Sequence, residues 1–308
     1  MDRKDKERAG RGGIDKAACH PFLAAMAVQS ANWPDIPTGT GRLEAGWITA
    51  AALFASDDAI EEYLRYEGSF HADMDRKTCA AAMMADYGYI FSTAVVPLFA
   101  GFGLIPDLSP RQFALRFYVT PLEHDGQVHE ARRAHVRFLS PAFSTDRGND
   151  TNTPCETAIL DSGALCDLFR RSIEDHFRPL VGQLHARTGL ARSALWRLVA
   201  DAVAGTFLDA GRRFGRIEAA KATAMTVLKQ PGSPLDNRQL HYFDLTLADE
   251  GHGAISHTFR ARGGCCRHYT VDDGAVCPTC VLNTPERRDA ELRQAMRHHV
   301  RKTMGMSS

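Results

Sequence analysis

Four of the eight cysteines in this 308-residue chain lie close together near its C-terminal end. Cys265 and Cys266 are adjacent, and after ten further residues Cys277 and Cys280 follow with two residues between them. The resulting C-C-x10-C-x2-C array places four thiols in one short segment. Such a set is what a four-thiolate metal centre requires, and an iron–sulfur cluster is the main candidate. The array therefore restricts the fold and chemistry of this chain more than any other feature.

A [2Fe–2S] cluster fits the array because each of its irons takes two thiolates, so that each cysteine pair could serve one iron. The adjacent pair needs a turn, since neighbouring side chains point apart in an extended chain. Gly263 and Gly264 directly precede this pair, and we expect them to give the backbone the freedom to make that turn.

Two other interpretations of the array remain open. Structural zinc sites prefer two C-x2-C pairs, and here one pair has no spacer. The segment from Cys277 to Cys280 also has the C-x-x-C spacing of a redox-active dithiol. That chemistry normally lies between a strand and a helix of a βαβ unit, and the sequence shows no such unit.

Composition indicates a soluble protein without a strong electrostatic preference. Apolar residues make up 44% of the chain, and 37 basic residues balance 37 acidic ones, which gives no reason to expect nucleic acid as a partner. The longest apolar run, Ser92 to Ile105, is short for a bilayer span and contains Pro97, so we expect no integral membrane segment. Residues 1–13 lack the hydrophobic region of an export signal and are predicted to form a disordered leader. We therefore expect a cytoplasmic protein, in which disulfides are uncommon.

Hydrophobic periodicity predicts an α+β fold that is mainly helical, with antiparallel strand hairpins and a small C-terminal iron–sulfur segment. A first hairpin is expected from the alternation in 111–119, the turn signal Asp125-Gly126 and a returning strand over 128–139. A second hairpin is expected over 240–260. Helices are predicted over 73–99 (with an end or bend near Pro97), 162–184, 193–213, 217–228 and from Thr284-Pro285 onward.

The chain is predicted to divide into four parts. Residues 1–13 are the leader, 14–260 a mainly helical body, 261–283 the cluster segment and 284–308 a helical tail. The turn-rich stretch 140–154 is expected to be a loop, and we place a subdomain boundary near 140–157.

The array, with Arg262 before it and Tyr269 after the adjacent pair, resembles the C-terminal signature of the siderophore-iron reductases, the FhuF-like family. The resemblance is specific from Arg262 to Cys280, and the helical region at 194–196 resembles the body of that family. It implies a [2Fe–2S] cluster bound by the four cysteines and one-electron reduction of a ferric siderophore in the cytoplasm. The chain departs from the pattern at Val281, where proline is more usual, and in its charged tail.

No nicotinamide or flavin site is readable in the sequence, so we expect electrons to arrive from a donor protein outside this chain. No catalytic nucleophile or base is expected. We expect nearby cations to raise the cluster potential and to attract an anionic chelate; these are Arg260, Arg262, Arg267 and His268. The alternative is a non-enzymatic iron–sulfur or zinc-binding sensor or binding module.

Overall fold

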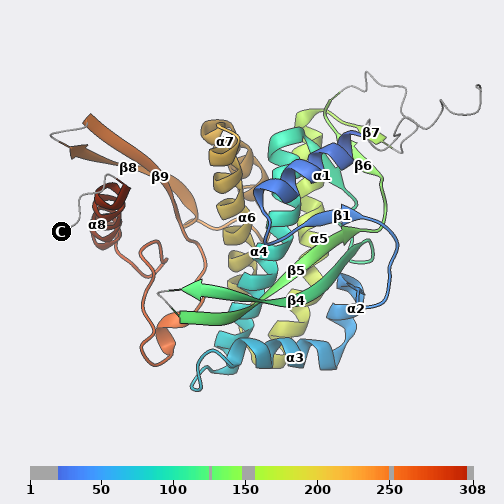
Figure 1. Ribbon diagram of the computed structural model, residues 1–308, viewed down its shortest axis with the longest axis horizontal. Helices are drawn as coiled ribbons and strands as arrows, with labels where there is room; N and C mark the ends of the chain where they lie inside the picture. Colours follow the sequence, from blue (N-terminus) through green and yellow to red (C-terminus); the bar gives the residue numbers. More distant parts are fainter. Residues whose placement is uncertain (1–19, 125–126, 148–156, 250–252, 304–308) are drawn as a thin grey trace, which may run out of the picture.

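The computed structural model describes residues 20–124, 127–147, 157–249 and 253–303 of the chain. Figure 1 shows a helical body, with an arm formed by β8, β9 and α8 at one edge. This architecture confirms the predicted α+β class with a mainly helical content. The predicted leader over 1–13 and the Asp125-Gly126 turn lie outside the described residues.

The described helices are α1 (Pro21–Asn32), α2 (Ala50–Ala55), α3 (Asp57–Gly68), α4 (Arg76–Phe102), α5 (Ser162–Thr188), α6 (Arg192–Arg213), α7 (Ile217–Leu228), the 3₁₀-helix η1 (His268–Thr270) and α8 (Pro285–Thr303). The described strands are β1 (Thr38–Thr40), β2 (Ile48–Thr49), β3 (Leu104–Pro106), β4 (Phe113–His124), β5 (Gln127–Phe138), β6 (Phe143–Thr145), β7 (Thr157–Ile159), β8 (His241–Asp249) and β9 (Gly253–Ala261).

Helix α4 runs through the centre of the body and is buried along most of its length. The Asp75 carboxylate caps its start by accepting a hydrogen bond from Thr78 N at 2.6 Å, and Gly103 ends it in the left-handed conformation with φ 65°. Its length and composition would suit a membrane crossing, but most of its apolar stretch packs inside the body, as in the core helix of a soluble protein. A central, buried α4 therefore organises the packing of the other helices.

The prediction that this helix ends or bends near Pro97 is wrong in one respect, because α4 continues to Phe102. Proline has no N–H, so the carbonyl of Thr93, four residues earlier, loses its usual helical partner. The buried Gln29 side chain of α1 replaces that partner, since its Nε2 atom donates to Thr93 O at 2.9 Å. A side chain distant in sequence thus satisfies the carbonyl that the proline leaves unpaired.

Helices α5, α6 and α7 pack beside α4. The Asp161 carboxylate caps α5 through Ala164 N at 2.8 Å, as the sequence predicts. A Cβ atom on Gly88 of α4 would approach the Cβ of Ala202 of α6 to 3.1 Å, so the two helices meet closely at this point. The apolar residues of α5 recur at helical spacing and are all buried, namely Leu165, Phe169, Ile173, Phe177, Leu180 and Leu184.

The first predicted hairpin is present as β4 and β5, which pair antiparallel from Phe113 opposite Phe138 to His124 opposite Gln127. Strand β1 adds to β5 in parallel and β2 adds to β4 antiparallel, which gives the order β1-β5-β4-β2. The alternation in 111–119 places Val119 on the same face as the buried Phe113 and Leu115, but Val119 is 58% exposed. Arg132, which lies opposite Val119 on β5, packs against the rings of Tyr63 and Tyr66 of α3.

The stretch 140–154, expected to be a loop, contains the short strand β6. It pairs antiparallel with β3 and in parallel with β7, and together they form a three-stranded sheet. A three-residue strand carries too little alternation to be recognised from its sequence, and its pairing partners are distant in the chain.

The arm contains the second predicted hairpin, β8 and β9, which pair from His241 opposite Ala261 to Asp249 opposite Gly253. Helix α8 packs on this hairpin, and the hydroxyl of Thr284 accepts a hydrogen bond from Arg287 N at 3.3 Å, as expected for the predicted cap. A second, smaller core joins the helix to the hairpin and consists of Leu245, Leu247, Leu292 and Met296. The segment between β9 and α8, residues 262–284, carries the cysteine array and is called the cysteine loop below.

Candidate metal centre

The cysteine loop starts at the end of β9 and turns back on itself. Arg262 N donates a hydrogen bond to Thr279 O at 3.0 Å, so the start of the loop lies against its end. The helix η1 forms the far side of the loop. This closure brings the two cysteine pairs, ten residues apart in sequence, into one small volume.

A buried carboxylate of α6 holds the start of the loop. Asp201 is 2% exposed, and its two carboxylate oxygens accept hydrogen bonds from Gly263 N at 2.8 Å and Gly264 N at 2.9 Å. A Cβ on Gly263 would lie 2.0 Å from Asn237 Oδ1, and one on Gly264 would lie 3.0 Å from the backbone of α6. The glycines therefore permit a close approach to the body.

The expected role of these glycines in turning the backbone is not what the structure shows. Neither residue has a positive φ, whereas Arg267, which follows the adjacent cysteines by one residue, has a φ of 63°. This left-handed residue makes the turn, and its backbone N–H donates to Cys265 Sγ at 3.3 Å.

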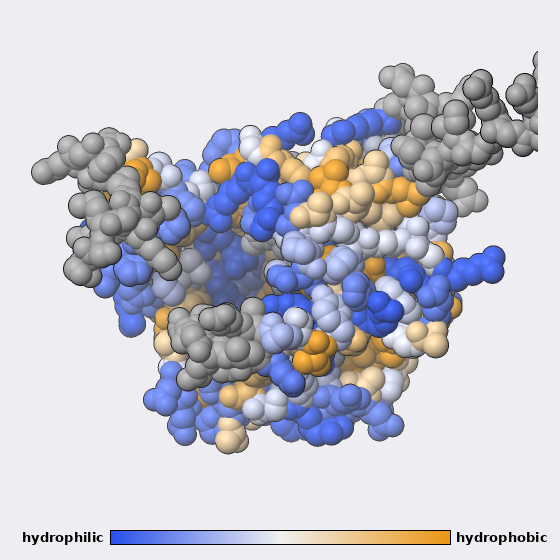
Figure 2. Space-filling view, in the orientation of Figure 1, coloured by the Kyte–Doolittle hydropathy of each residue, from blue (hydrophilic) through white to orange (hydrophobic). Residues whose placement is uncertain are grey.

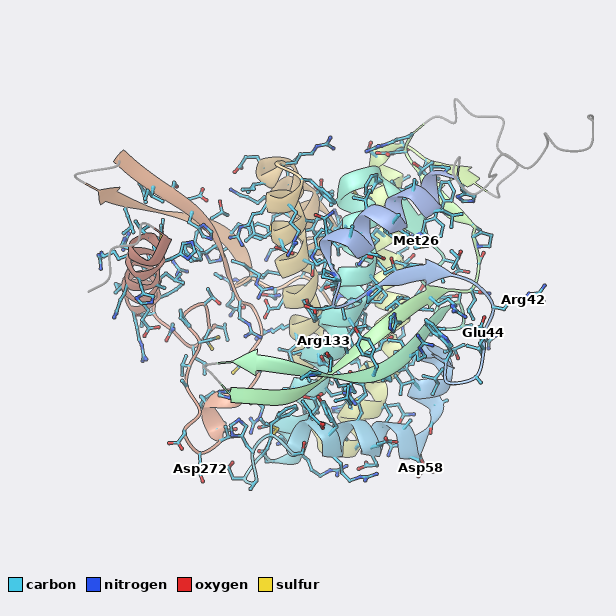
Figure 3. All side chains as sticks on the ribbon, in the orientation of Figure 1. Met26, Arg42, Glu44, Asp58, Arg133 and Asp272 are labelled. Atoms are coloured by element: carbon cyan, nitrogen blue, oxygen red, sulfur yellow. The ribbon has the colours of Figure 1, made fainter. Side chains whose placement is uncertain are left out.

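The N-terminal end of α4 holds the far side of the loop. Arg267 pairs with the carboxylate of Asp75 at 2.8 Å and donates from Nε to Thr78 Oγ1 at 3.1 Å. Asp272 N donates to Asp73 Oδ2 at 2.6 Å, and Figure 3 shows Asp272 at the lower edge of the molecule, where the loop passes the start of α4. The loop is thus fixed to the body at two places, one on α6 and one on α4.

The four thiols of the loop lie close enough to influence one another. Burial raises the pKa of the Cys280 thiol, and the neighbouring Cys265 thiol raises it further. Burial raises the pKa of Cys277, Arg262 opposes that rise, and the Cys280 and Cys266 thiols add to it. Cys266 and Cys277 also share a neighbour, since Nη1 of Arg262 lies 3.9 Å and 3.6 Å from their respective Sγ atoms. Contacts therefore connect the two ends of the array.

The four predicted cations differ in what they contact. Arg262 is the one whose side chain contacts sulfur atoms in the described structure, and its Nε also lies 3.5 Å from Asp201 Oδ2. Arg260 donates to the backbone carbonyl of Asp201, and His268 packs against the ring of His71. Arg267 pairs with Asp75, whereas Arg260 and Arg262 both interact electrostatically with the Cys277 thiol.

The geometry of the array bears on its interpretation as a redox dithiol. Cys280 N donates to Cys277 O at 2.9 Å, so the C-x-x-C segment is a tight turn and does not open a helix as in a redox dithiol. All four cysteines of the loop are free thiols. Across the described residues no group of three or more Cys, His, Asp or Glu side chains is arranged to hold a metal ion. Four free thiols in one loop provide the ligand number that a [2Fe–2S] cluster needs, two for each iron.

Residues 262–282 match the family model described as the FhuF 2Fe-2S C-terminal domain. The cofactor of this segment is a [2Fe–2S] cluster. The match covers the whole array and Arg262, and it supports the FhuF-like resemblance. No curated protein matches the chain.

Sequence reasoning located the four cysteines and Arg262 but missed the residues that fix the loop to the body. Asp201 carries the clearest signal that could have revealed it, because it is an acidic residue within the apolar run from Leu198 to Val203 of α6. A buried acid on such a face needs donors, and the two glycine amides supply them. Asp75 and Thr78 gave no comparable signal, since a helix cap explains both.

Proposed function

We propose that this chain is a cytoplasmic ferric-siderophore reductase whose cluster is held by Cys265, Cys266, Cys277 and Cys280. The observation that carries the proposal is the FhuF 2Fe-2S match on a loop that holds four free thiols, two of them beside Arg262. The match is to a family associated with ferric siderophore reduction. Its four thiols provide the complete ligand set that two irons need.

The reaction transfers one electron and forms no bond to the protein. When bound, the [2Fe–2S] cluster supplies one-electron transfer. An external one-electron donor protein is oxidised by one electron, and the ferric ion of the substrate chelate is reduced to ferrous iron. The hard oxygen donors of a siderophore hold ferrous iron far more weakly, so the metal dissociates, and the released oxygens take protons from solvent.

The residues of the chain position and tune this site. Asp201 fixes the start of the loop through two backbone amides, and Arg267 fixes its far side through Asp75. Arg262 directs its guanidinium at Cys266 and Cys277 and favours the more negative, reduced state of the site. Three of the four cysteines are half-buried, which leaves the loop close enough to the surface for a docked donor.

The cofactor and the reaction are tested separately. Purified holoprotein should be red-brown, bleach with dithionite and contain two irons per chain, whereas a colourless protein containing zinc would refute the cluster. For the reaction, anaerobically reduced protein is titrated with ferric trihydroxamate and ferric tricatecholate chelates. One equivalent of ferrous iron should appear, trapped by a ferrous-specific chelator, for each protein reoxidised. An intact cluster that none of these chelates reoxidises would favour a sensor.

A further inference from the structure

A cavity of about 330 Å³ lies between α4, α6 and the end of β9. Its wall is mixed, with the rings of Trp33 and Tyr89 and the hydroxyl of Thr206 beside charged groups. The elements that form it border a hydrophilic hollow between the arm and the body, visible in Figure 2. Small-molecule sites combine non-polar surface with placed polar groups, and the volume of this cavity lies at the lower end of their range.

Arg262 joins this cavity to the cysteine loop. Its side chain lines the cavity and also lies 3.9 Å and 3.6 Å from the Sγ atoms of Cys266 and Cys277. An occupant of the cavity would therefore be separated from two thiols by a single side chain. Asp201, which fixes the loop to α6, lines the same cavity.

The charged groups of the cavity are held in place by contacts inside the protein. Asp209 Oδ2 accepts hydrogen bonds from Trp33 Nε1 at 2.7 Å and from Arg213 Nε at 3.0 Å. Asp201 is compensated by Arg262 and by the glycine amides. A guanidinium carries five N–H groups, and the contacts of Arg262 to carboxylate and sulfur use only its Nε and Nη1 atoms. Arg262 can therefore also donate to oxygen atoms of an occupant.

Size alone would favour a different cavity. A space of about 590 Å³ is lined by β3, β6 and α5, with Ile105, Phe143 and Leu168 among its wall residues. None of its lining residues belongs to the cysteine loop. Electron transfer requires the acceptor to lie close to the donor, so the smaller cavity is the better placed of the two.

We propose that the cavity between α4 and α6 receives the iron-bearing end of an oxygen-ligated ferric chelate, with Arg262 between the chelate and the Cys266 and Cys277 thiols. This inference rests on the proposed function and assigns its substrate site. The volume accepts the compact metal-binding end, and the rest of a larger chelate extends into the hollow shown in Figure 2. The electron leaves the protein on the side of Cys266 and Cys277 and reduces the ferric ion by one unit of charge.

Binding is tested apart from electron transfer with redox-inert probes, the gallium(III) complexes of a trihydroxamate and of a tricatecholate. Ala85 lines the cavity from α4 and is half-buried, so Ala85→Phe fills the space without changing charge. Ala82 is half-buried on the same helix, one turn earlier, and outside the lining, so Ala82→Phe is the matched control. Calorimetric titration of the holoproteins should show at least one probe bound by the unmodified protein. Ala85→Phe should weaken it about tenfold or more, and Ala82→Phe less than twofold.

The proposal is overturned if neither probe binds, or if Ala85→Phe and Ala82→Phe bind alike. Should Ala85→Phe fail to fold, Tyr89→Trp decides, since Tyr89 is 43% exposed and the larger ring narrows the cavity. It should weaken binding several-fold, and unchanged binding would contradict the proposal.

The reductase function and the binding site can fail independently. If Ala85→Phe weakens binding of the gallium probes but ferric chelates do not reoxidise the reduced protein, the binding site stands and the reductase function is contradicted. If ferric chelates reoxidise the reduced protein and Ala85→Phe does not affect that reaction, the reductase function stands and the binding site is contradicted.

Discussion

The Nη1 atom of Arg262 lies 3.6 Å from the Sγ atom of Cys277. The same guanidinium contacts Cys266 and the buried carboxylate of Asp201, and it lines the cavity between α4 and α6. One cation thus links Asp201, which fixes the loop, with two of the four predicted cluster ligands and the proposed substrate site.

Replacing Arg262 by Gln should lower the midpoint potential of the holoprotein by on the order of 50 mV, where 59 mV is a tenfold change in a one-electron equilibrium. The variant loses a cation beside sulfur, and that cation stabilises the reduced form more than the oxidised one. A redox titration monitored by electron paramagnetic resonance measures the shift. Arg267→Gln is the control, because the Arg267 side chain pairs with Asp75. Equal shifts in the two variants would count against a specific role for Arg262.

Serine substitutions at the four cysteines should fall into two spectroscopic classes. If thiols that neighbour one another in the structure share an iron, Cys265→Ser and Cys280→Ser should perturb the reduced cluster alike. Cys266→Ser and Cys277→Ser, both beside Arg262, should form the second class. Mössbauer and paramagnetic resonance spectra of the four reduced variants make the comparison. A grouping of Cys265 with Cys266 would instead support ligand pairs that follow the sequence.

Asp201→Asn should loosen the cysteine loop, because one carboxylate oxygen becomes an amide that opposes a glycine N–H. Losing one buried charge-assisted hydrogen bond costs about 2 kcal/mol, and we expect a loss of that size with faster cluster loss to an iron chelator. Thermal unfolding and the rate of bleaching report the two effects. Asp209→Asn, on the same helix but 41% exposed in its side chain, is the control and should retain the cluster. Equal bleaching rates would contradict the anchoring role.

His176 should make the protein less stable in acid. Burial lowers its pKa to about 4 from an ordinary 6.5, and its ring is bonded to Tyr87 Oη and Leu108 O, each at 2.7 Å. Between those values the unfolded chain binds a proton that the folded chain does not. The free energy of unfolding should therefore fall by about 3 kcal/mol as pH drops from 7 to 4, and this contribution is complete above pH 7.

Denaturant unfolding of the unmodified protein and His176→Gln between pH 4 and 8 isolates this contribution. The stability advantage of the unmodified protein should shrink as the pH falls. Burial raises the pKa of Glu67 to about 8, so Glu67 acts with the opposite sign, its contribution being lost as pH rises. Glu67 is present in both proteins, and its effect cancels in the difference. If the free energies of unfolding of the two proteins change in parallel between pH 4 and 8, His176 does not cause the loss of stability in acid.

Gln29 and Pro97 should be energetically coupled. Gln29→Leu leaves the buried Thr93 carbonyl without a donor and should cost about 1–3 kcal/mol. In a Pro97→Ala background the new N–H at position 97 can bond that carbonyl, so the same substitution should cost about 1 kcal/mol less. The hydrogen bond from Gln29 to Ile36 O is lost in both backgrounds and does not affect the difference. Additive effects in a double-mutant cycle would contradict the coupling.

Local patterns in the sequence predicted what local patterns can determine. The helices α5 and α7, the β4–β5 and β8–β9 hairpins and the cap at Thr284 all follow from spacing and capping chemistry. Strands β1, β2, β3, β6 and β7 are two or three residues long, too short for a recognisable period, and their partners lie far along the chain. Helix α4 continues past Pro97 with its Thr93 carbonyl bonded to Gln29. Gln29 is distant in sequence, so local patterns around Pro97 could not predict this contact.

Local patterns likewise predicted only part of the candidate metal centre. The spacing of the cysteines predicted the ligand set, because the chemistry of the metal requires four thiolates close together. It did not predict which thiols are neighbours, since that depends on how the loop closes through Arg262 N and Thr279 O. The sequence did not reveal the cavity either, because its wall combines Trp33 with residues of α4, α6 and β9.

The hydrogen bonds from Gly263 and Gly264 to Asp201 have a consequence for protein engineering. The matched segment 262–282 lies within the cysteine loop, but the conformation of the loop depends on the Asp201 carboxylate, about sixty residues earlier in the chain. A graft of residues 262–282 alone onto another scaffold would carry every thiol and still lack the template that orients them. A functional graft would need a host helix with an acidic side chain that accepts hydrogen bonds from the two glycine amides. The two glycines would have to be kept, because the loop and the helix lie too close for a side chain at these positions.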